Sequence, residues 1–205
     1  MKKEGFIIAS GIIGLTGCGL NHKKIQQPNI ILILADDMGY ECICAYGNSE
    51  YNTPFIDSLA SEGVRFTQCH ANPLSTPSRV GIMTGKYNFR NYKDFGYLDR
   101  KEVTFANILK DAGYATCVAG KWQLNGKYYP EKYTDCKDST LPYHFGFDEY
   151  CLWNFTESEK SSRYANPTIT CNENKIAVDS TNYGEDIFSD FIIRFIDKNK
   201  EKPFL

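Results

Sequence analysis

The sequence lacks several features that would point to particular classes of protein. Its 23 Lys and Arg nearly cancel its 25 Asp and Glu, so no broad basic field exists to bind nucleic acid. Only three His occur in 205 residues, too few for a His-rich zinc or iron centre. No CxxC pair supports a zinc ribbon or a thioredoxin-like site. Any bound metal is therefore expected to have oxygen ligands.

What is present is the composition of an ordinary folded domain. Hydrophobic residues make up 42% and charged residues 23%, which argues against a disordered or fibrous chain. At about 150 residues per domain, the length allows one domain or one and a half. No internal repeat divides it.

The N-terminus has the pattern of an export signal. Lys2 and Lys3 precede an apolar stretch, residues 6–15, that is too short to span a bilayer. The following Thr16-Gly17-Cys18 resembles the end of a bacterial lipobox, in which the Cys is lipidated. The alternative is a buried helix that ends at a chance Cys.

This pattern predicts a division of the chain. A lipoprotein signal peptide is expected at residues 1–17, a lipid-anchored tether at 18–28 and the folded domain at 29–205. The expected location is the periplasm or cell surface of a bacterium, with membrane contact through Cys18 alone. Among the other cysteines, the spacing leaves open a disulfide from Cys136 to Cys151 or to Cys171.

Strand and helix patterns alternate along the domain. The β-branched apolar run 30–35 predicts a strand buried on both faces. Further strands are predicted at 64–67, at 114–119 and opening at 202–205, helices at 54–62, 103–112 and 183–198, and loops or insertions over 127–180. The predicted fold is α/β, a doubly wound mixed or parallel sheet flanked by helices.

Two adjacent carboxylates, Asp36 and Asp37, follow the first predicted strand. Like charges this close raise each other's pKa, and a hard divalent cation would relieve the repulsion. The alternative is that one Asp caps a loop while the other faces water.

A second cluster begins at Ser75, two residues before Pro77, which suits the first position of a helix. Ser75 would then lie at a helix N-terminus, where free N–H groups favour an anion. Arg79 can fold back over the same spot. The alternative is an ordinary Ser/Thr-rich helix cap followed by an Arg.

Together these segments resemble a known family. The chain resembles the N-terminal part of the sulfatases, in the alkaline phosphatase superfamily, over most of residues 28–126. The resemblance lies in residues 28–47, in the run from TPFIDSLASEG to GIMTGKY, and in AGYATCVAGKWQLNG. The sharpest element is Ser75-x-Pro77-x-Arg79. It resembles the signature in which a Cys or Ser is oxidised to formylglycine, here in the Ser form.

The resemblance implies a role for each matching residue. Asp36 and Asp37 would bind calcium, or alternatively magnesium, and Ser75 as formylglycine would contact the same metal. Arg79 would hold the formylglycine oxygens, and Lys121 would bind a sulfate oxygen.

The implied reaction is hydrolysis of a sulfuric ester, with a sulfated carbohydrate as the expected substrate. One hydroxyl of the hydrated aldehyde attacks sulfur and releases the alcohol, and deprotonation of the other eliminates sulfate. A radical-type maturase would have to convert Ser75 to formylglycine.

Two departures from the family pattern leave alternatives open. Gln123 stands where many sulfatases have His, and Gln cannot take a proton. The family's remaining metal ligands fall after the strand that begins near Pro203, so the domain is expected to be truncated at its C-terminus. The alternatives are a phosphate or phosphonate ester hydrolase with an unmodified Ser75, and an inactive or glycan-binding fragment.

Overall fold

The computed structural model describes residues 27–157 and 161–205. The predicted signal peptide, Cys18 and most of the tether lie outside the described residues. No helix in the described part is long and apolar enough to cross a membrane.

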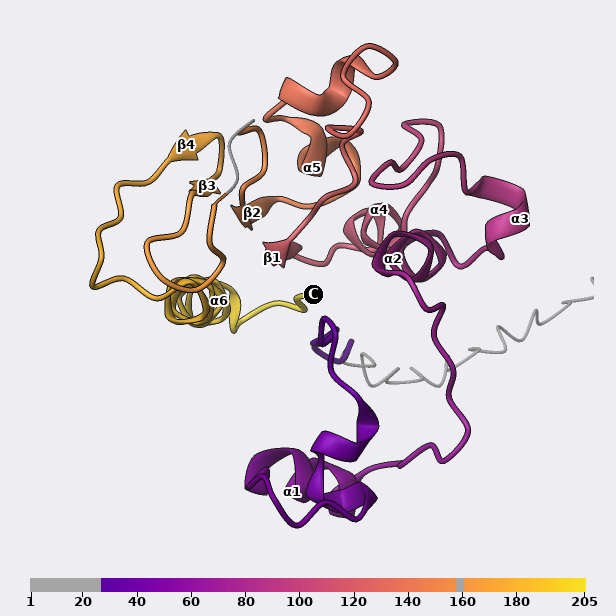
Figure 1. The fold of residues 1–205 in the computed structure, drawn as a ribbon, viewed down its shortest axis with the longest axis vertical. Helices are drawn as coiled ribbons and strands as arrows, with labels where there is room; N and C mark the ends of the chain where they lie inside the picture. The colour runs from indigo at the N-terminus through magenta and orange to yellow at the C-terminus, as the bar shows by residue number, and fades with distance from the viewer. Residues whose placement is uncertain (1–26, 158–160) are drawn as a thin grey trace, which may run out of the picture.

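A four-stranded mixed sheet forms the centre of the molecule, in the order β1-β2-β3-β4 (Figure 1). Strands β1 (Cys117–Lys121) and β2 (Glu149–Trp153) pair in parallel. Strand β3 (Ile169–Cys171) is antiparallel to β2, and β4 (Asn174–Lys175) is antiparallel to β3. The predicted mixed sheet is confirmed.

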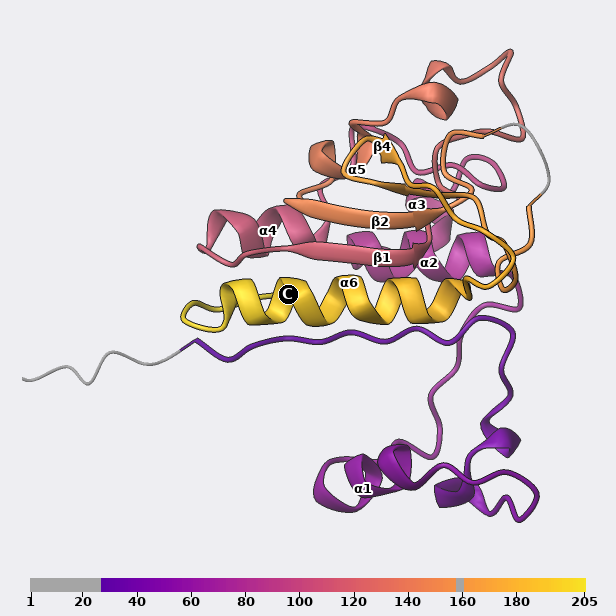
Figure 2. The same ribbon diagram turned by 90° about the vertical axis from the view of Figure 1, so that its left-hand side faces the viewer.

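Helices cover both faces of this sheet (Figures 1 and 2). Helix α6 (Gly184–Asn199) lies along one face, while α2 (Ser75–Thr84), α4 (Phe105–Asp111) and α5 (Leu141–His144) lie on the other. The alternation of β2 accounts for the two cores, because successive strand side chains point to opposite faces. Tyr150 and Leu152 join the larger core, and Cys151 packs toward α6.

Helix α6 forms where the sequence predicts it. Its Phe188, Phe191 and Phe195 recur at helical spacing and are buried against the sheet side. Helix α4 is also confirmed, although it is shorter than predicted. Thr104 and Asn107 form a reciprocal capping box at its start.

A small lobe with little apolar burial lies apart from the sheet (Figure 2). It contains two 3-10 turns, η1 (Tyr40–Cys42) and η2 (Cys44–Tyr46), and helix α1 (Pro54–Glu62), none with a buried residue. Helix α1 has the predicted bounds, starting at Pro54 and stopping before Gly63. The predicted strand at 64–67 is wrong: these residues pair with no strand in the described part of the chain, and Val64 and Phe66 are exposed.

The predicted buried strand at 30–35 is also wrong. The segment is extended and runs roughly parallel to α6 in the view of Figure 2, but its side chains from Ile31 to Leu34 are 48–81% exposed. Within the described residues its one backbone hydrogen bond runs from the Ile30 N–H to the Phe204 carbonyl, 2.8 Å. No neighbouring strand in this part of the chain satisfies the rest.

Residues 203–205 lie next to β1 and partly bear out the predicted strand opening. Phe204 bridges Ala115 in parallel, and Leu205 accepts a hydrogen bond from the Cys117 N–H at 2.9 Å. Strand β1 itself starts three residues later than predicted and ends at Lys121.

The prediction of loops and insertions over 127–180 is wrong in part. This region supplies η3 (Thr134–Lys137), α5, β2, β3 and β4. Strand β2 carries apolar side chains on both faces and therefore shows no alternation of polarity that would mark it.

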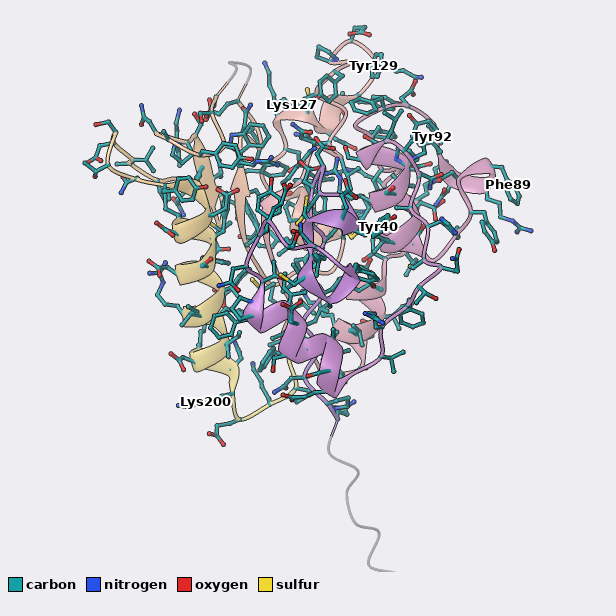
Figure 3. All side chains as sticks on the ribbon, turned by 60° about the horizontal axis from the view of Figure 1, so that its bottom comes forward. Tyr40, Phe89, Tyr92, Lys127, Tyr129 and Lys200 are labelled. Carbon is teal, nitrogen blue, oxygen red and sulfur yellow. A yellow bond between two sulfur atoms is a disulfide. The ribbon has the colours of Figure 1, made fainter. Side chains whose placement is uncertain are left out.

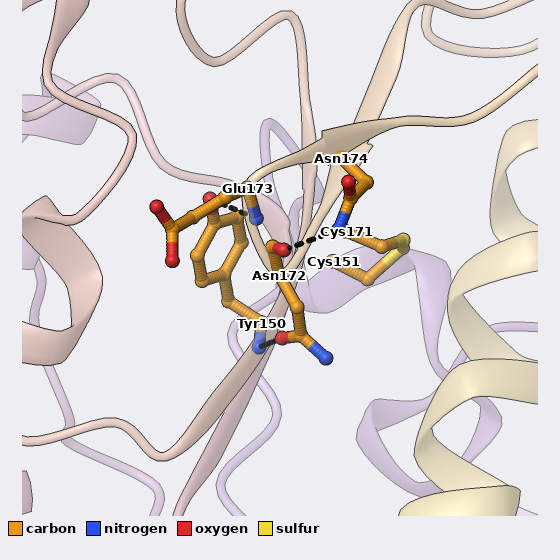
Figure 4. The surroundings of a disulfide bond; sticks show 6 residues. All are labelled: Tyr150, Cys151, Cys171, Asn172, Glu173 and Asn174. Carbon is orange, nitrogen blue, oxygen red and sulfur yellow. Dashed lines mark hydrogen bonds between the residues drawn. A yellow bond between two sulfur atoms is a disulfide. The ribbon is translucent and has the colours of Figure 1, made fainter.

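A disulfide joins Cys151 to Cys171, and neither pairing that the spacing left open, with Cys136, is formed (Figure 4). The two cysteines are directly opposite in the β2–β3 register, which brings their side chains together. A two-residue turn follows, in which Asn172 and Glu173 have positive φ angles of 46° and 70°. The Tyr150 hydroxyl accepts the Glu173 N–H at 2.6 Å.

Exposed aromatic side chains mark the edge at α3 (Asn88–Asn91). Phe89 is 83% exposed and lies at the periphery in Figure 3. It stacks on Tyr87 with ring centroids 5.9 Å apart. These rings lie outside the core and add little to its burial.

Asp148 couples the start of β2 to the residue before β1, and its removal should destabilise the fold. Its carboxylate accepts the Thr116 N–H at 3.0 Å and pairs with Lys110 at 2.7 Å. Burial alone would raise the pKa of Asp148, but these hydrogen bonds hold the pKa below its ordinary 3.8. Solvent screens the exposed ion pair, so we expect Asp148→Ala to lower the free energy of unfolding at pH 7 by only about 0.5–1.5 kcal/mol.

Because the folded-state pKa is lowered, this stabilisation is present above pH 3.8 and is lost as the pH falls through the folded pKa. Urea unfolding of wild type and Asp148→Ala should therefore converge in acid. Asp111→Ala, at an exposed position on α4, serves as the control. A gap between wild type and Asp148→Ala that is unchanged in acid would contradict this account.

Candidate functional site

Three segments meet at one end of β1. They are the extended segment that ends at Asp36, the N-terminus of α2 at Ser75, and Lys121 at the carboxyl end of β1. A cavity of about 600 Å³ lies between them and is lined by Asp36, Asp37, Ser75, Arg79 and Lys121 along with apolar residues. Ligands of open α/β sheets bind beyond the carboxyl ends of strands, which is this position.

Ser75 is the first residue of α2. Leu74 before it is extended, so the helix starts two residues earlier than predicted, and Pro77 is its third residue rather than its first. Ser75 remains at the helix N-terminus, where the dipole favours an anion. Its Oγ lies 3.4 Å from both Lys121 Nζ and Arg79 Nη2.

Arg79 folds back over Ser75 from one turn further along α2. Its Nε donates to the Ser75 carbonyl at 3.2 Å, and its Nη1 donates to the Trp122 carbonyl. Burial lowers the pKa of Arg79 to about 10, although the nearby negative charge of Asp36 acts to raise it. Arg79 therefore carries its positive charge at neutral pH.

Asp36 accepts hydrogen bonds from two cations. Lys121 Nζ lies 3.0 and 2.9 Å from its two carboxylate oxygens, and Arg163 Nη1 lies 2.5 Å from Oδ2. Burial by itself raises the pKa of Asp36, but these two partners outweigh it and hold the pKa below its ordinary value. Each of the three side chains is about one-fifth exposed, so solvent screens these ion pairs less than surface pairs.

The other two predicted residues take less part in this cluster. Asp37 lines the cavity with an exposed side chain and a φ of 57°, so the backbone turns sharply after Asp36. Gln123 has a φ of 45° and is half-buried. In the described part of the chain, Gln123 is not among the residues that line the cavity.

Sequence reasoning missed Arg163. It lies in the region interpreted as loops, 127 residues from Asp36, and no local spacing or motif connects the two. The hydrogen bond to Asp36 raises the pKa of Arg163. Only the folded arrangement brings it to the site.

The residues present do not by themselves make the implied calcium or magnesium site. Calcium takes six to eight oxygen ligands and magnesium six. Among the described residues no group of three or more His, Cys, Asp or Glu could hold a metal ion, and the Asp36 carboxylate is bound by Lys121 and Arg163.

The sulfatase family profile matches residues 28–205 of this chain. The chain belongs to the sulfatase family. It is 44% identical over 128 residues to an N-acetylgalactosamine-6-O-sulfatase of Bacteroides thetaiotaomicron, covering 56% of this chain and 25% of the relative. It is 31% identical over 201 residues to an N-acetylglucosamine-6-O-sulfatase of the same organism, covering 94% and 32%.

Solved structures agree with this assignment. One, a complex with its substrate D-glucosamine-2-N,6-O-disulfate, superposes with a TM-score of 0.71 at 31% identity over 87% of this chain and 33% of that chain. The resemblance to the sulfatase fold is confirmed. The chain spans about a quarter to a third of the length of the curated relatives described above.

The Asp36 ion pairs should tether the extended segment to the sheet. Asp36→Ala removes both ion pairs from a segment whose other ties to the sheet, among the described residues, are at its start, where the Ile30 N–H donates to the Phe204 carbonyl and Asn29 Oδ1 accepts from the Phe204 N–H. We expect cleavage by chymotrypsin within residues 31–35 to become several-fold faster than in wild type, measured by mass spectrometry of the fragments. Asp37→Ala is the matched control and should leave the rate near that of wild type. Equal cleavage of all three proteins would refute the tether.

Proposed function

We propose that the protein hydrolyses sulfuric esters of glycans, with Ser75 as the site of the nucleophile after its oxidation to formylglycine. The observation that carries the proposal is the position of Ser75 Oγ, 3.4 Å from both Lys121 Nζ and Arg79 Nη2 at the N-terminus of α2. A sulfate placed there would meet two cations and a helix dipole.

Within this proposal the residues of the chain have distinct tasks. Formylglycine, once hydrated, supplies the attacking hydroxyl. Lys121 donates to a sulfate oxygen and stabilises charge that develops during transfer. Arg79 holds the nucleophile from the opposite side, and its hydrogen bonds to the Ser75 and Trp122 carbonyls fix its guanidinium. Gln123 would leave the proton transfer that His performs in many sulfatases to another group.

A sulfated amino sugar is the substrate class that the relatives favour. Two of them are named for removal of 6-O-sulfate from N-acetylgalactosamine and N-acetylglucosamine, and a structural relative binds a disulfated glucosamine. A lipid-anchored, exported protein with Cys18 as its anchor would meet such polymers outside the cell. A radical-type maturase is the proposed partner that oxidises Ser75, and calcium is the proposed metal.

A second reading keeps Ser75 unmodified and makes the protein a phosphate or phosphonate ester hydrolase. The arrangement that favours it is the same serine hydroxyl, held between Lys121 and Arg79 at a helix N-terminus.

The state of Ser75 separates the two readings. Expression in a host with a radical maturase, followed by mass spectrometry of the peptide that contains Ser75, should reveal a mass two hydrogens lower than that of serine. Expression without the maturase is the control and should leave the serine intact. Serine alone in both samples, with turnover of a phosphate ester, would reverse the proposal in favour of the second reading.

Substitution of Ser75 should remove turnover and spare the fold. Its hydroxyl makes only long hydrogen bonds, so Ser75→Ala should change the free energy of unfolding by less than about 1 kcal/mol. Sulfate release should fall at least about a thousandfold, because the nucleophile is gone. Thr76→Ala is the matched control: Thr76 is fully buried and accepts the Gly96 N–H at 2.9 Å.

Thr76→Ala should therefore cost about 1–3 kcal/mol of stability, while its folded fraction retains turnover. Unfolding by urea and sulfate release are measured on all three proteins. A Ser75→Ala protein that unfolds, or that keeps full turnover, would be inconsistent with a nucleophile at this position.

A further inference from the structure

We propose that Arg163 binds a second anionic group of the substrate, so that the site selects sugars that carry two negative charges. This inference rests on the proposed sulfatase function. It adds a specificity-determining residue to a site whose reacting sulfate is held by Lys121 and Arg79. Three independent features of the structure carry it.

The first feature is how firmly the backbone around Arg163 is held. The Gly184 N–H donates to the Tyr164 carbonyl at 2.8 Å, and Ala165 bridges Tyr183. A Cβ at Gly184 would lie 2.0 Å from the Arg163 carbonyl oxygen, so only glycine allows this close approach of α6. Arg163 is therefore placed by backbone contacts with the start of α6, independently of its side chain.

The second feature is an imbalance of charge. Lys121 and Arg79 line the cavity, and Arg163 lies beside it on the far side of Asp36. Among the described residues Asp36 is the one carboxylate within hydrogen-bond distance of any of these three cations. Glu185 reaches Arg163 Nε only at 3.9 Å and is half-exposed. Arg163 Nη1 donates to Asp36 and Nη2 donates to the Tyr164 hydroxyl at 3.0 Å. A guanidinium has five N–H donors, so donor capacity remains for a sulfate or a carboxylate.

The third feature is the aromatic surface around the guanidinium. Arg163 lies 5.2 Å from the ring of Tyr164 and 5.9 Å from that of Trp153. Tyr164 in turn stacks on Tyr183 with centroids 5.9 Å apart, and both rings are close to half-exposed. Exposed ring faces next to a cation fit a flat, partly apolar sugar ring that carries an anionic substituent.

These features assign the substrate by its chemistry. The sulfate to be removed lies over Ser75, the ring lies toward Tyr164, and a second sulfate or a carboxylate on the same or the next sugar meets Arg163. Asp36 accepts a hydrogen bond from the same guanidinium that this second anion would bind.

The test is a pair of sugars that differ by one sulfate. N-acetylgalactosamine 6-sulfate and N-acetylgalactosamine 4,6-disulfate are titrated by calorimetry into the full chain carrying Ser75→Ala, so that neither is consumed. Adding Arg163→Ala should weaken binding of the disulfated sugar about tenfold or more, which is the effect of losing a charge-assisted hydrogen bond. Binding of the monosulfated sugar should change less than about twofold.

Two further variants complete the design. Arg163→Lys keeps the charge without the fork and should restore part of the lost affinity. Arg194→Ala, an exposed arginine on α6, is the matched control and should affect neither sugar.

Equal weakening of both sugars by Arg163→Ala, or no change in either, would overturn the proposal while leaving the proposed function intact. If the parent protein binds neither sugar, both the proposal and the proposed glycan sulfatase function fail for this sugar class. Retained preference for the disulfated sugar after Arg163→Ala also counts against Arg163.

Discussion

The arrangement of the site depends on the two ion pairs of the Asp36 carboxylate. This carboxylate accepts hydrogen bonds from Lys121, at the end of β1, and from Arg163, in the loop packed against α6. These partners are 85 and 127 residues away in the sequence. The extended segment that carries Asp36 has little else to hold it within the described residues. A single half-buried carboxylate thus connects three described parts of the chain that have no backbone hydrogen bonds to one another at this point.

The same interaction accounts for the electrostatics around Ser75. Burial alone would favour a neutral Asp36, yet its two cationic partners, Lys121 and Arg163, favour the ionised carboxylate and hold its pKa below the ordinary value. Lys121 is thereby brought to 3.4 Å from Ser75 Oγ, while Arg79 approaches from within α2. The serine lies between two cations because one of them is anchored by a carboxylate from elsewhere.

Local sequence signals predicted the elements that depend on local interactions. Helices α1 and α6 start and stop where Pro54, Gly63 and the phenylalanine spacing indicate, and Ser75, Arg79, Lys121 and Asp36 meet as their motif order suggests. The run at 30–35 failed because a buried strand needs neighbours, and the described residues supply one hydrogen bond. Arg163 was missed because its ion pair exists only in three dimensions.

Arg163, the proposed specificity residue, is positioned by the core rather than by its own loop. Phe188 and Phe191 of α6 pack against the sheet and fix where that helix begins. Gly184 at its first turn then admits the backbone of Arg163 at a distance that no side chain would allow. The loop supplies the guanidinium, but the packing of α6 determines where it lies. A substitution at Gly184 would therefore alter the site by moving Arg163, although it touches neither Ser75 nor Lys121.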